Sequence, residues 1–297
     1  MLNMKNVKII VSFSGGKDSQ ACLIKAVKDY GAENVEAVFC DTGWEHPITY
    51  EHIKYVTDNL SVKLTILKNN KVNGFEDLCI RMKCFPVASR RACTSELKIK
   101  PMIDYILTLD NSCLIIQGIR AKESKARSEM PVECSYFKEY FDESVSGQYR
   151  KRDVKKWCEK NDASVIRPIF TWTAQEVIDY ILENKQDVNP LYKKGSARVG
   201  CYPCIMSRQS EIKILSKDEE MVKRLINLEK KVNESGDKKH ACFFSKGYIP
   251  KKYCKINGNG YPTAQEVIDY VNRNEIGMDT LFEEDYSCMS LYHGLCE

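Results

Sequence analysis

The stretch Val7-Lys8-Ile9-Ile10-Val11-Ser12-Phe13-Ser14-Gly15-Gly16-Lys17-Asp18-Ser19 decides how this chain folds. Its apolar first half predicts a buried strand, and the residues after it predict a short loop that opens a helix near Asp18. Gly15 and Gly16 allow the backbone to approach an anion and to present N–H groups to it. The helix N-terminus adds a partial positive charge, and Lys17 adds a full one. The stretch therefore predicts a phosphate-binding loop and, with it, nucleotide chemistry.

Strand and helix signals alternate over the first two-thirds of the 297-residue chain. Short apolar runs predict strands at residues 7–13, 35–40, 63–67, 113–117 and 164–169. Helices are expected at 19–30, 47–60, 96–109 and 173–184. This order predicts an α/β, Rossmann-like fold with a mostly parallel sheet, helices on both faces and a small C-terminal appendage. Ligands in such folds bind at the carboxyl ends of the strands.

Two domains are expected: a nucleotide-binding domain with a four-cysteine site over residues 1–235, and a small C-terminal module over residues 236–297. Residues 133–163 are polar and rich in aromatic side chains, which predicts an irregular insertion between strands. The octapeptide that begins at Thr173 recurs at Thr263, each time with a glutamate three residues later. This capping-box spacing predicts a capped helix at both places; a small duplication is the alternative.

Composition sets limits on location and partners. A hydrophobic fraction of 43% with 29% charged residues is typical of a soluble globular protein, and no apolar run is long enough to span a membrane. The N-terminus lacks a signal-peptide core, so we expect a cytoplasmic protein without a membrane partner. A net charge of +4 permits a nucleic-acid partner without requiring one. In this setting, fourteen cysteines indicate metal ligation, redox chemistry or burial rather than disulfides.

The loop string resembles the pyrophosphate-binding loop (PP-loop) of ATP pyrophosphatases and phosphoadenylyl-sulfate (PAPS) reductases, and the resemblance extends over about residues 7–215. It lacks the spaced first glycine of a Walker loop. The resemblance implies that the loop residues hold ATP or PAPS, with Mg²⁺ on the phosphates. The segment after the second predicted strand looks like the family's adenosine-recognition segment. The nucleotide-binding residues implied so far are Ser14, Gly15, Gly16, Lys17, Asp18, Ser19, Cys40, Asp41 and Thr42.

A second basic stretch follows the fourth predicted strand, from Gly118 through Arg120 to Arg127, and resembles the family's Gly-Ile-Arg stretch. Guanidinium groups match phosphate or sulfate oxygens bidentately and keep their charge at any working pH. Arg120 and Arg127 are therefore predicted to hold the α-phosphate or sulfate, beside Gly118 in the nucleotide site. Lys17 is predicted to stabilise the leaving pyrophosphate.

Four cysteines form two pairs: Cys84 with Cys93, and Cys201 with Cys204 in a CxxC motif. Four thiolates make a closed tetrahedral site for zinc or a 4Fe–4S cluster. The sequence before the CxxC motif resembles cluster-bearing PAPS-reductase relatives, which favours 4Fe–4S; four reduced, buried thiols are the other reading. Cluster-bearing adenylyl-sulfate reductases have two adjacent cysteines in the first segment. The spaced pair here looks more like the ATP pyrophosphatases of DNA phosphorothioation systems.

The C-terminus contains a candidate nucleophile. PAPS reductases carry a catalytic cysteine near their own C-terminus, and Cys296 stands in a similar place within a different local sequence. Cys296 is thus a candidate catalytic residue, with Cys288 as a second candidate. An ordinary frayed terminus is the alternative.

The leading functional prediction is an ATP pyrophosphatase that cleaves ATP to AMP and pyrophosphate and activates a substrate for sulfur transfer, in nucleic-acid thiolation or phosphorothioation. An intact loop with its lysine suits a ligand with β- and γ-phosphates, which PAPS and adenylyl sulfate lack. The alternatives are a PAPS or adenylyl-sulfate reductase that produces sulfite, and a non-catalytic nucleotide-binding subunit. Expected partners are the nucleotide, a sulfur donor such as a cysteine desulfurase or a thiol reductant, and further protein chains in a homo-oligomer or complex.

Overall fold

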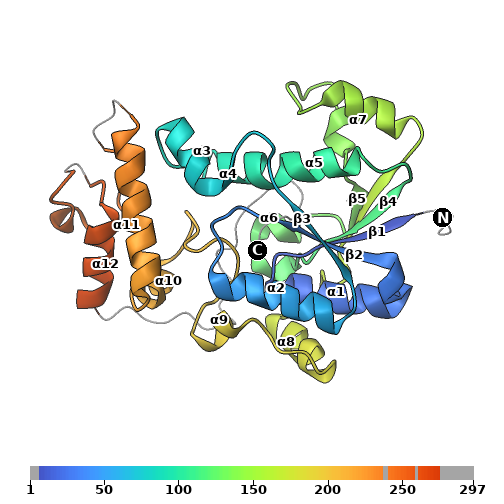
Figure 1. Ribbon diagram of the computed structural model, residues 1–297, viewed down its shortest axis with the longest axis horizontal. Helices are drawn as coiled ribbons and strands as arrows, with labels where there is room; N and C mark the ends of the chain where they lie inside the picture. Colours follow the sequence, from blue (N-terminus) through green and yellow to red (C-terminus); the bar gives the residue numbers. More distant parts are fainter. Residues whose placement is uncertain (1–6, 237–239, 258–259, 275–297) are drawn as a thin grey trace.

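A six-stranded sheet forms the centre of the computed structural model, which describes residues 7–236, 240–257 and 260–274 (Figure 1). The strands are β1 (Lys8–Ser12), β2 (Val35–Cys40), β3 (Lys63–Leu67), β4 (Cys113–Ile116), β5 (Glu133–Ser135) and β6 (Ala163–Ile166). Their order is β3-β2-β1-β4-β6-β5, and only β5 runs antiparallel to its neighbour. The predicted mostly parallel α/β sheet is confirmed.

The strand order places a crevice next to the glycine loop. The chain runs outward from β1 through β2 to β3 and then returns to the other side of β1 with β4. The loops that follow β1 and β4 therefore leave the sheet in opposite directions at adjacent strands, which is the usual ligand position in an open parallel sheet. Both predicted phosphate-binding stretches begin at this point.

Helices cover both faces of the sheet. Ile9 and Val11 of β1 pack on one face and Ile10 on the other, as the alternation of a strand requires. The first face carries α1 (Lys17–Tyr30), α2 (Pro47–Asn59) and α8 (Ala174–Glu183), and the second carries α5 (Lys100–Ile106) and α7 (Lys151–Cys158) (Figure 1). Short elements complete the chain: η2 (Ala32–Asn34), η4 (Ala121–Glu123), α6 (Lys125–Ser128), η5 (Lys138–Phe141), α9 (Pro190–Lys193) and η6 (Lys251–Tyr253).

Two predicted segments differ from the structure. The single helix expected at 96–109 is a composite of α4 (Ala92–Thr94), the π-helical turn η3 (Ser95–Ile99) and α5. Pro101 has no N–H to donate to the preceding turn, and the helix widens directly before it. The insertion at 133–163, expected to be irregular, contains β5, η5 and α7. Three of its aromatic residues, Tyr136, Phe137 and Tyr140, are buried in the core on the α5 side of the sheet, and this burial orders the segment.

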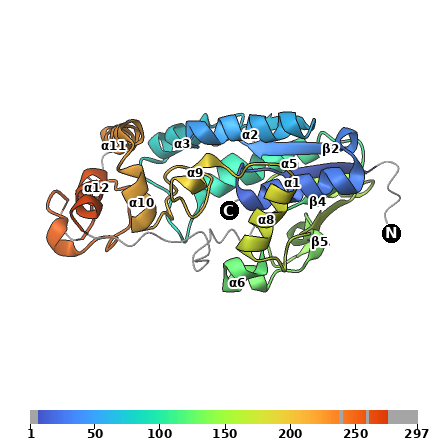
Figure 2. The same ribbon diagram turned by 90° about the horizontal axis from the view of Figure 1, so that it is seen from below.

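A third core lies beyond the carboxyl ends of the strands, where α3 (Gly74–Met82) meets α10 (Gln209–Leu215), α11 (Glu219–Glu234) and α12 (Ala264–Arg273). These last three helices stay grouped at one end of the molecule in both views (Figures 1 and 2). Phe75 and Leu225 pack in this core together with Phe243, so both sides of the predicted boundary at 235/236 contribute to it. The division into two domains stays a prediction.

The repeated octapeptide forms the same capped helix twice. Thr173 accepts a hydrogen bond from the Glu176 N–H at the start of α8, and Thr263 does the same for Glu266 at the start of α12. The prediction of a second capped helix is confirmed. Within the described part of the chain, none of the helices is both long and apolar enough to cross a membrane.

One charged side chain is buried inside the sheet. Glu36 of β2 is 1% exposed, accepts a hydrogen bond from Tyr105 Oη at 2.9 Å and pairs with Lys8 Nζ at 2.6 Å and Lys63 Nζ at 3.3 Å. Burial by itself raises the pKa of Glu36, but the hydrogen bonds from Lys8, Thr65 and Tyr105 and the charge of Lys8 outweigh it and lower the pKa to about 2. The carboxylate therefore stabilises the fold only while it is ionised.

Stability is expected to depend on pH through Glu36. Because its folded-state pKa lies below the unfolded value, its contribution is complete above about pH 5 and is lost as the pH falls to about 2. Urea unfolding should show Glu36→Gln to be about 3 kcal/mol less stable than wild type at pH 7, with the difference closing near pH 2. Glu51→Gln, on an exposed side chain, is the control and should follow the wild type. A difference that does not change with pH would contradict this assignment.

A candidate nucleotide and thiol site

The glycine loop is held in place by the segment around α9. Gly15 has φ +83°, and a Cβ there would lie 2.9 Å from Ile53 Cγ1. Both the left-handed backbone conformation and the lack of room for a side chain therefore favour glycine at this position. Asn189 donates from Nδ2 to the Gly15 carbonyl at 3.2 Å, and the Lys17 N–H donates to Tyr192 Oη at 3.0 Å. Two distant segments thus meet at the loop and fix its shape.

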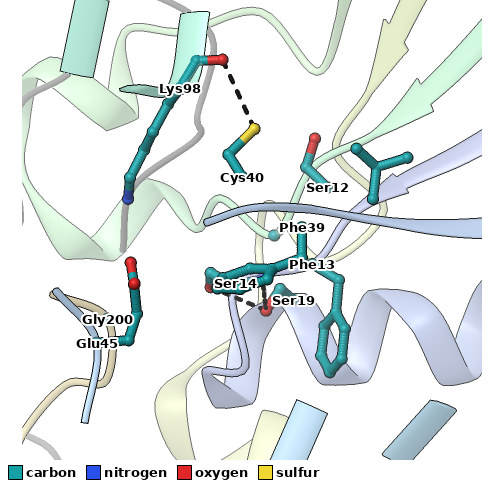
Figure 3. A pocket seen from close by; sticks show the side chains of 11 residues that line it. Ser12, Phe13, Ser14, Ser19, Phe39, Cys40, Glu45, Lys98 and Gly200 are labelled. Atoms are coloured by element: carbon teal, nitrogen blue, oxygen red, sulfur yellow. Dashed lines mark hydrogen bonds between the residues drawn. The ribbon is translucent and has the colours of Figure 1, made fainter. Parts of the chain in front are cut away.

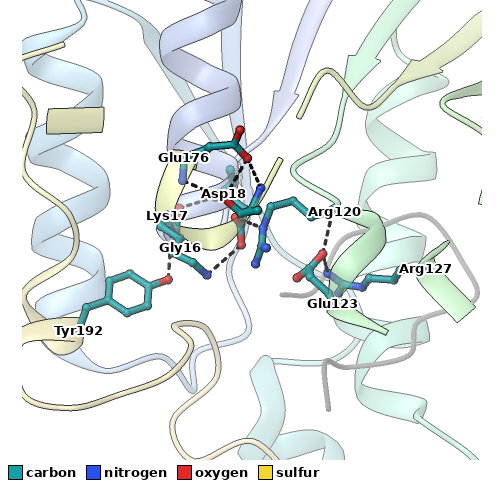
Figure 4. Close-up of polar contacts among 10 residues, drawn as sticks. Gly16, Lys17, Asp18, Arg120, Glu123, Arg127, Glu176 and Tyr192 are labelled. Carbon is teal, nitrogen blue, oxygen red and sulfur yellow. Dashed lines mark hydrogen bonds and ion pairs between the residues drawn. The ribbon is translucent and has the colours of Figure 1, made fainter. Parts of the chain in front are cut away.

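Three buried charges gather at the start of α1 (Figure 4). Lys17, Asp18 and Arg120 are each less than 5% exposed. Asp18 lies between the two cations: Lys17 Nζ is 3.1 Å from its Oδ2, and Arg120 Nε is 2.6 Å from its Oδ1. Burial alone raises the pKa of Asp18, but the charges of Lys17 and Arg120 outweigh it, so its pKa lies below the usual value. Two cations and one anion leave this group with a charge of +1, which favours an anionic ligand.

The end of β4 lies directly against the start of α1. A Cβ on Gly118 would be 2.6 Å from both the Asp18 carbonyl carbon and the Ser19 nitrogen, so only glycine fits. The next turn places Glu123, whose Oε2 accepts from the Arg120 N–H at 2.7 Å and pairs with Arg127 NH1 at 2.5 Å. Arg120 therefore contacts Asp18 at the start of α1 directly, whereas Arg127 is connected to Arg120 through Glu123.

The segment after β2 forms a hydrogen-bonded turn. Asp41 accepts through Oδ1 from the Gly43 N–H at 2.8 Å and from Tyr50 Oη at 2.7 Å, while its Oδ2 lies 3.0 Å from Lys68 Nζ. Asp41, one of the predicted nucleotide-binding residues, therefore holds this turn in shape. Burial tends to raise its pKa, but its partners lower it, which keeps the carboxylate ionised.

A pocket joins the two predicted nucleotide-binding segments (Figure 3). Ser14 and Ser19 line it from the loop side, Cys40 and Glu45 line it from the β2 side, and Gly118 lines it from the segment after β4. Ser14 N donates to Ser19 Oγ at 3.2 Å, which holds the loop edge of the pocket. The structure therefore brings together residues that the sequence placed on separate strands.

Three of the four predicted metal-binding cysteines line a second pocket. These are Cys93, Cys201 and Cys204, and the walls include the apolar side chains of Trp44 and Phe75. Cys84 is half-buried and does not line this pocket. Among residues 7–236, 240–257 and 260–274, no three His, Cys, Asp or Glu side chains converge as metal ligands. The donor chemistry suits a soft metal, whereas the four thiols do not form a closed site as they stand.

Lys98 connects the two pockets, and the sequence analysis had not selected it as a site residue. It is 7% exposed, comes from η3 and lines both pockets. We name the pocket beside the glycine loop the predicted nucleotide pocket, and the pocket lined by Cys93, Cys201 and Cys204 the thiol pocket. The Lys98 side chain points toward Glu45 across the predicted nucleotide pocket (Figure 3). Asn189 and Tyr192 were not selected either. All three residues lie near one of the cysteine pairs in the sequence, and this proximity was the only feature that could have indicated them as site residues. Cys296 and Cys288 lie outside the described residues.

Comparison with known proteins assigns the chain to a family. Residues 8–207 match the model of the phosphoadenosine phosphosulfate reductase domain. An uncharacterized 37.8 kDa protein of Escherichia phage 186 is 27% identical, over 97% of this chain and 96% of that protein. Two uncharacterized proteins of Methanocaldococcus jannaschii are 28% and 29% identical over 71% of this chain, which covers only 38% and 44% of their lengths.

Solved structures with related folds were also found. A phosphoadenylyl-sulfate reductase from Candida auris, in a phosphate complex, has 21% identity and a TM-score of 0.46 over 68% of this chain and 84% of that chain. The U34-tRNA thiolase NcsA from Methanococcus maripaludis, with its [4Fe-4S] cluster, has 16% identity and a TM-score of 0.34 over 93% of this chain and 83% of that chain. The assignment rests on the domain model, which covers more than half of the sequence and ends just after the CxxC motif. The chain belongs to the phosphoadenosine phosphosulfate reductase domain family.

Proposed function

We propose that this protein is an ATP pyrophosphatase that cleaves ATP between the α- and β-phosphates and so activates a substrate for sulfur transfer. The observation that carries the proposal is the buried Lys17–Asp18–Arg120 group beside the glycine loop at the switch point of the sheet. A surplus of positive charge that is kept away from water interacts strongly with a polyphosphate, because the surroundings screen it poorly. A single sulfate or phosphate would need fewer donors.

The proposed reaction is a substitution at the α-phosphorus. An oxygen of the acceptor, or of water, attacks this phosphorus; the bond to the bridging oxygen breaks, and pyrophosphate leaves with the electron pair. The acceptor's proton passes to solvent. The substrate is MgATP, so the metal arrives with the nucleotide. Lys17 and the loop N–H groups stabilise the charge on the leaving pyrophosphate, while Arg120 offsets the charge that develops at the α-phosphate.

Sulfur transfer is proposed because the thiol pocket adjoins the predicted nucleotide pocket. Lys98 lines both, and Cys201 Sγ lies 3.6 Å from Thr42 Oγ1 in the adenosine segment. A nucleic acid is the proposed acceptor, and a cysteine desulfurase or a thiol reductant is the proposed source of sulfur or electrons. We also propose that Cys84, Cys93, Cys201 and Cys204 hold a 4Fe–4S cluster, with zinc as the alternative. A cluster would supply a soft site for binding sulfur.

Metal analysis tests the cluster. Protein purified without oxygen is expected to absorb near 400 nm and to carry about four iron and four sulfide ions per chain. Cys201→Ser should lose most of the iron, because serine is a harder and less acidic ligand. Cys158→Ser, at a half-buried cysteine outside the pocket, is the matched control and should keep it. Zinc without sulfide would identify the alternative metal, and four metal-free thiols would overturn the site.

Product analysis tests the enzyme. Incubation with MgATP, nucleic acid and a sulfide source should release AMP and pyrophosphate in equal amounts, because the sulfur displaces AMP from the activated acceptor. Without nucleic acid, water takes the place of the acceptor and the same two products form. ADP and phosphate would show cleavage at a different bond, and tight ATP binding without turnover would indicate a non-catalytic subunit. Either result would overturn the proposed activity.

PAPS reduction is the second candidate, and the match of residues 8–207 to the reductase domain favours it. In that reaction a thiolate, for which Cys296 is the candidate, attacks the sulfur of PAPS; adenosine bisphosphate leaves, and a dithiol reductant then releases sulfite. Incubation with PAPS and thioredoxin separates the two functions, because only the reductase produces sulfite. Sulfite formation without cleavage of ATP would replace the leading proposal.

A further inference from the structure

Helix α11 lies beyond the matched family domain, yet it contacts the segment that lines both pockets. We propose that α11 is a positioning element of the site and that Arg224 is the residue through which it acts. This inference rests on the proposed nucleotide site. It gives the C-terminal helices a part in the chemistry of the preceding domain.

Arg224 holds the turn after β2 from outside. It donates through NH1 to the Glu45 carbonyl at 3.2 Å and through NH2 to the Gly43 carbonyl. Its guanidinium carbon lies 4.1 Å from the centre of the Trp44 ring, so the cation also stacks on the indole. A planar group with several fixed donors makes all three contacts at once, which the point charge of a lysine does not.

The same turn also contacts the CxxC motif. Trp44 Nε1 donates to the Pro203 carbonyl at 3.0 Å, and the Tyr202 N–H donates to the Trp44 carbonyl at 2.8 Å. Glu45 forms an isolated β-bridge with Cys201. Residues 43–45 therefore lie between Arg224 and the cysteines, and the Glu45 side chain lines the predicted nucleotide pocket. Loss of the Arg224 contacts is expected to loosen both pockets together.

A second connection fixes where α11 begins. Asp218 caps this helix, since its Oδ1 accepts from the Glu220 N–H at 3.1 Å and the Met221 N–H at 3.2 Å. Its Oδ2 lies 3.3 Å from His46 Nε2, and His46 Nδ1 accepts from the Ile48 N–H at 3.1 Å at the start of α2. The two N-caps are thus bonded to each other, which sets the place of Arg224 relative to the turn.

The test uses the full chain with Arg224→Lys, which keeps the charge but loses the planar fork. Lys223→Ala is the matched control on the same helix; its side chain is 71% exposed and pairs only with Glu219 in the described structure. We expect Arg224→Lys to weaken MgATP binding about tenfold in calorimetry, the loss that follows when two well-placed hydrogen bonds no longer hold a binding segment. Amide hydrogen exchange should become about tenfold faster in peptides covering 42–46 and 200–204, and stay unchanged in β1 and β4.

The outcomes separate the positioning role from a structural one and from the proposed function. Exchange that accelerates throughout the chain together with a lower melting temperature would show a structural role only and overturn the inference. Unchanged local exchange in Arg224→Lys would overturn it as well. If the wild type neither binds nor cleaves ATP, the proposed function fails, while the exchange comparison between the Arg224 and Lys223 variants still decides the positioning role.

Discussion

Replacing Lys17 by alanine is expected to reduce the release of pyrophosphate from MgATP by about 100- to 1,000-fold, the usual effect of removing one buried donor that stabilises transition-state charge. Lys17 is 4% exposed and adjoins the carboxylate of Asp18, so its charge is concentrated at the loop. Without it, Asp18 retains Arg120 as an ion-pair partner, and the group changes from a charge of +1 to zero. The site then loses much of its attraction for the leaving pyrophosphate.

The measurement is steady-state pyrophosphate release, with ATP affinity determined separately. Lys25→Ala is the control: it removes the same charge from the same helix, at a residue that pairs with Asp29 on the surface. It should retain wild-type turnover, because an exposed ion pair contributes little to stability and is screened by salt. Turnover and affinity that stay unchanged in a folded Lys17→Ala variant would refute the assignment of the loop as a pyrophosphate site.

Gly118→Ala is expected to be the most damaging single-methyl substitution in the site. The new Cβ would lie 2.6 Å from two backbone atoms at the start of α1, which are not flexible side-chain ends that move easily. Either β4 or α1 must shift, at a cost of about 1–3 kcal/mol. Since α1 carries Lys17 and Asp18, and the residue after Ile119 is Arg120, the same shift separates the charges that the proposed site needs together.

Urea unfolding and nucleotide binding should both respond to this substitution. Gly200→Ala is the steric control for stability, because a Cβ there meets nothing within 4 Å. The free energy of unfolding should fall for Gly118→Ala and stay near the wild-type value for Gly200→Ala. If Gly118→Ala leaves stability and ATP binding intact, the close approach of β4 to α1 does not position the site.

The positions of the segments proposed to bind the nucleotide were predictable because these segments lie on or next to regular elements. The strand at 35–40 and the strand at 63–67 agree with β2 and β3, and the loop after β1 opens α1 as its glycines and lysine indicate. The carboxyl ends of parallel strands meet at one edge, so Cys40, Gly118 and the loop residues had to lie close together. The insertion at 133–163 was less predictable, because its order comes from burial of aromatic side chains against a sheet formed elsewhere.

The two copies of one octapeptide separate local from tertiary information. By itself the sequence determined that each copy begins a helix, because the threonine and glutamate that cap it are neighbours in the chain. Only the tertiary structure decided that α8 packs on α1 beside the sheet, whereas α12 packs on α10 and α11 at the far end. Arg224 follows the same rule. Nothing local marks it, because its partners are backbone carbonyls about 180 residues away, and such contacts exist only once the chain has folded.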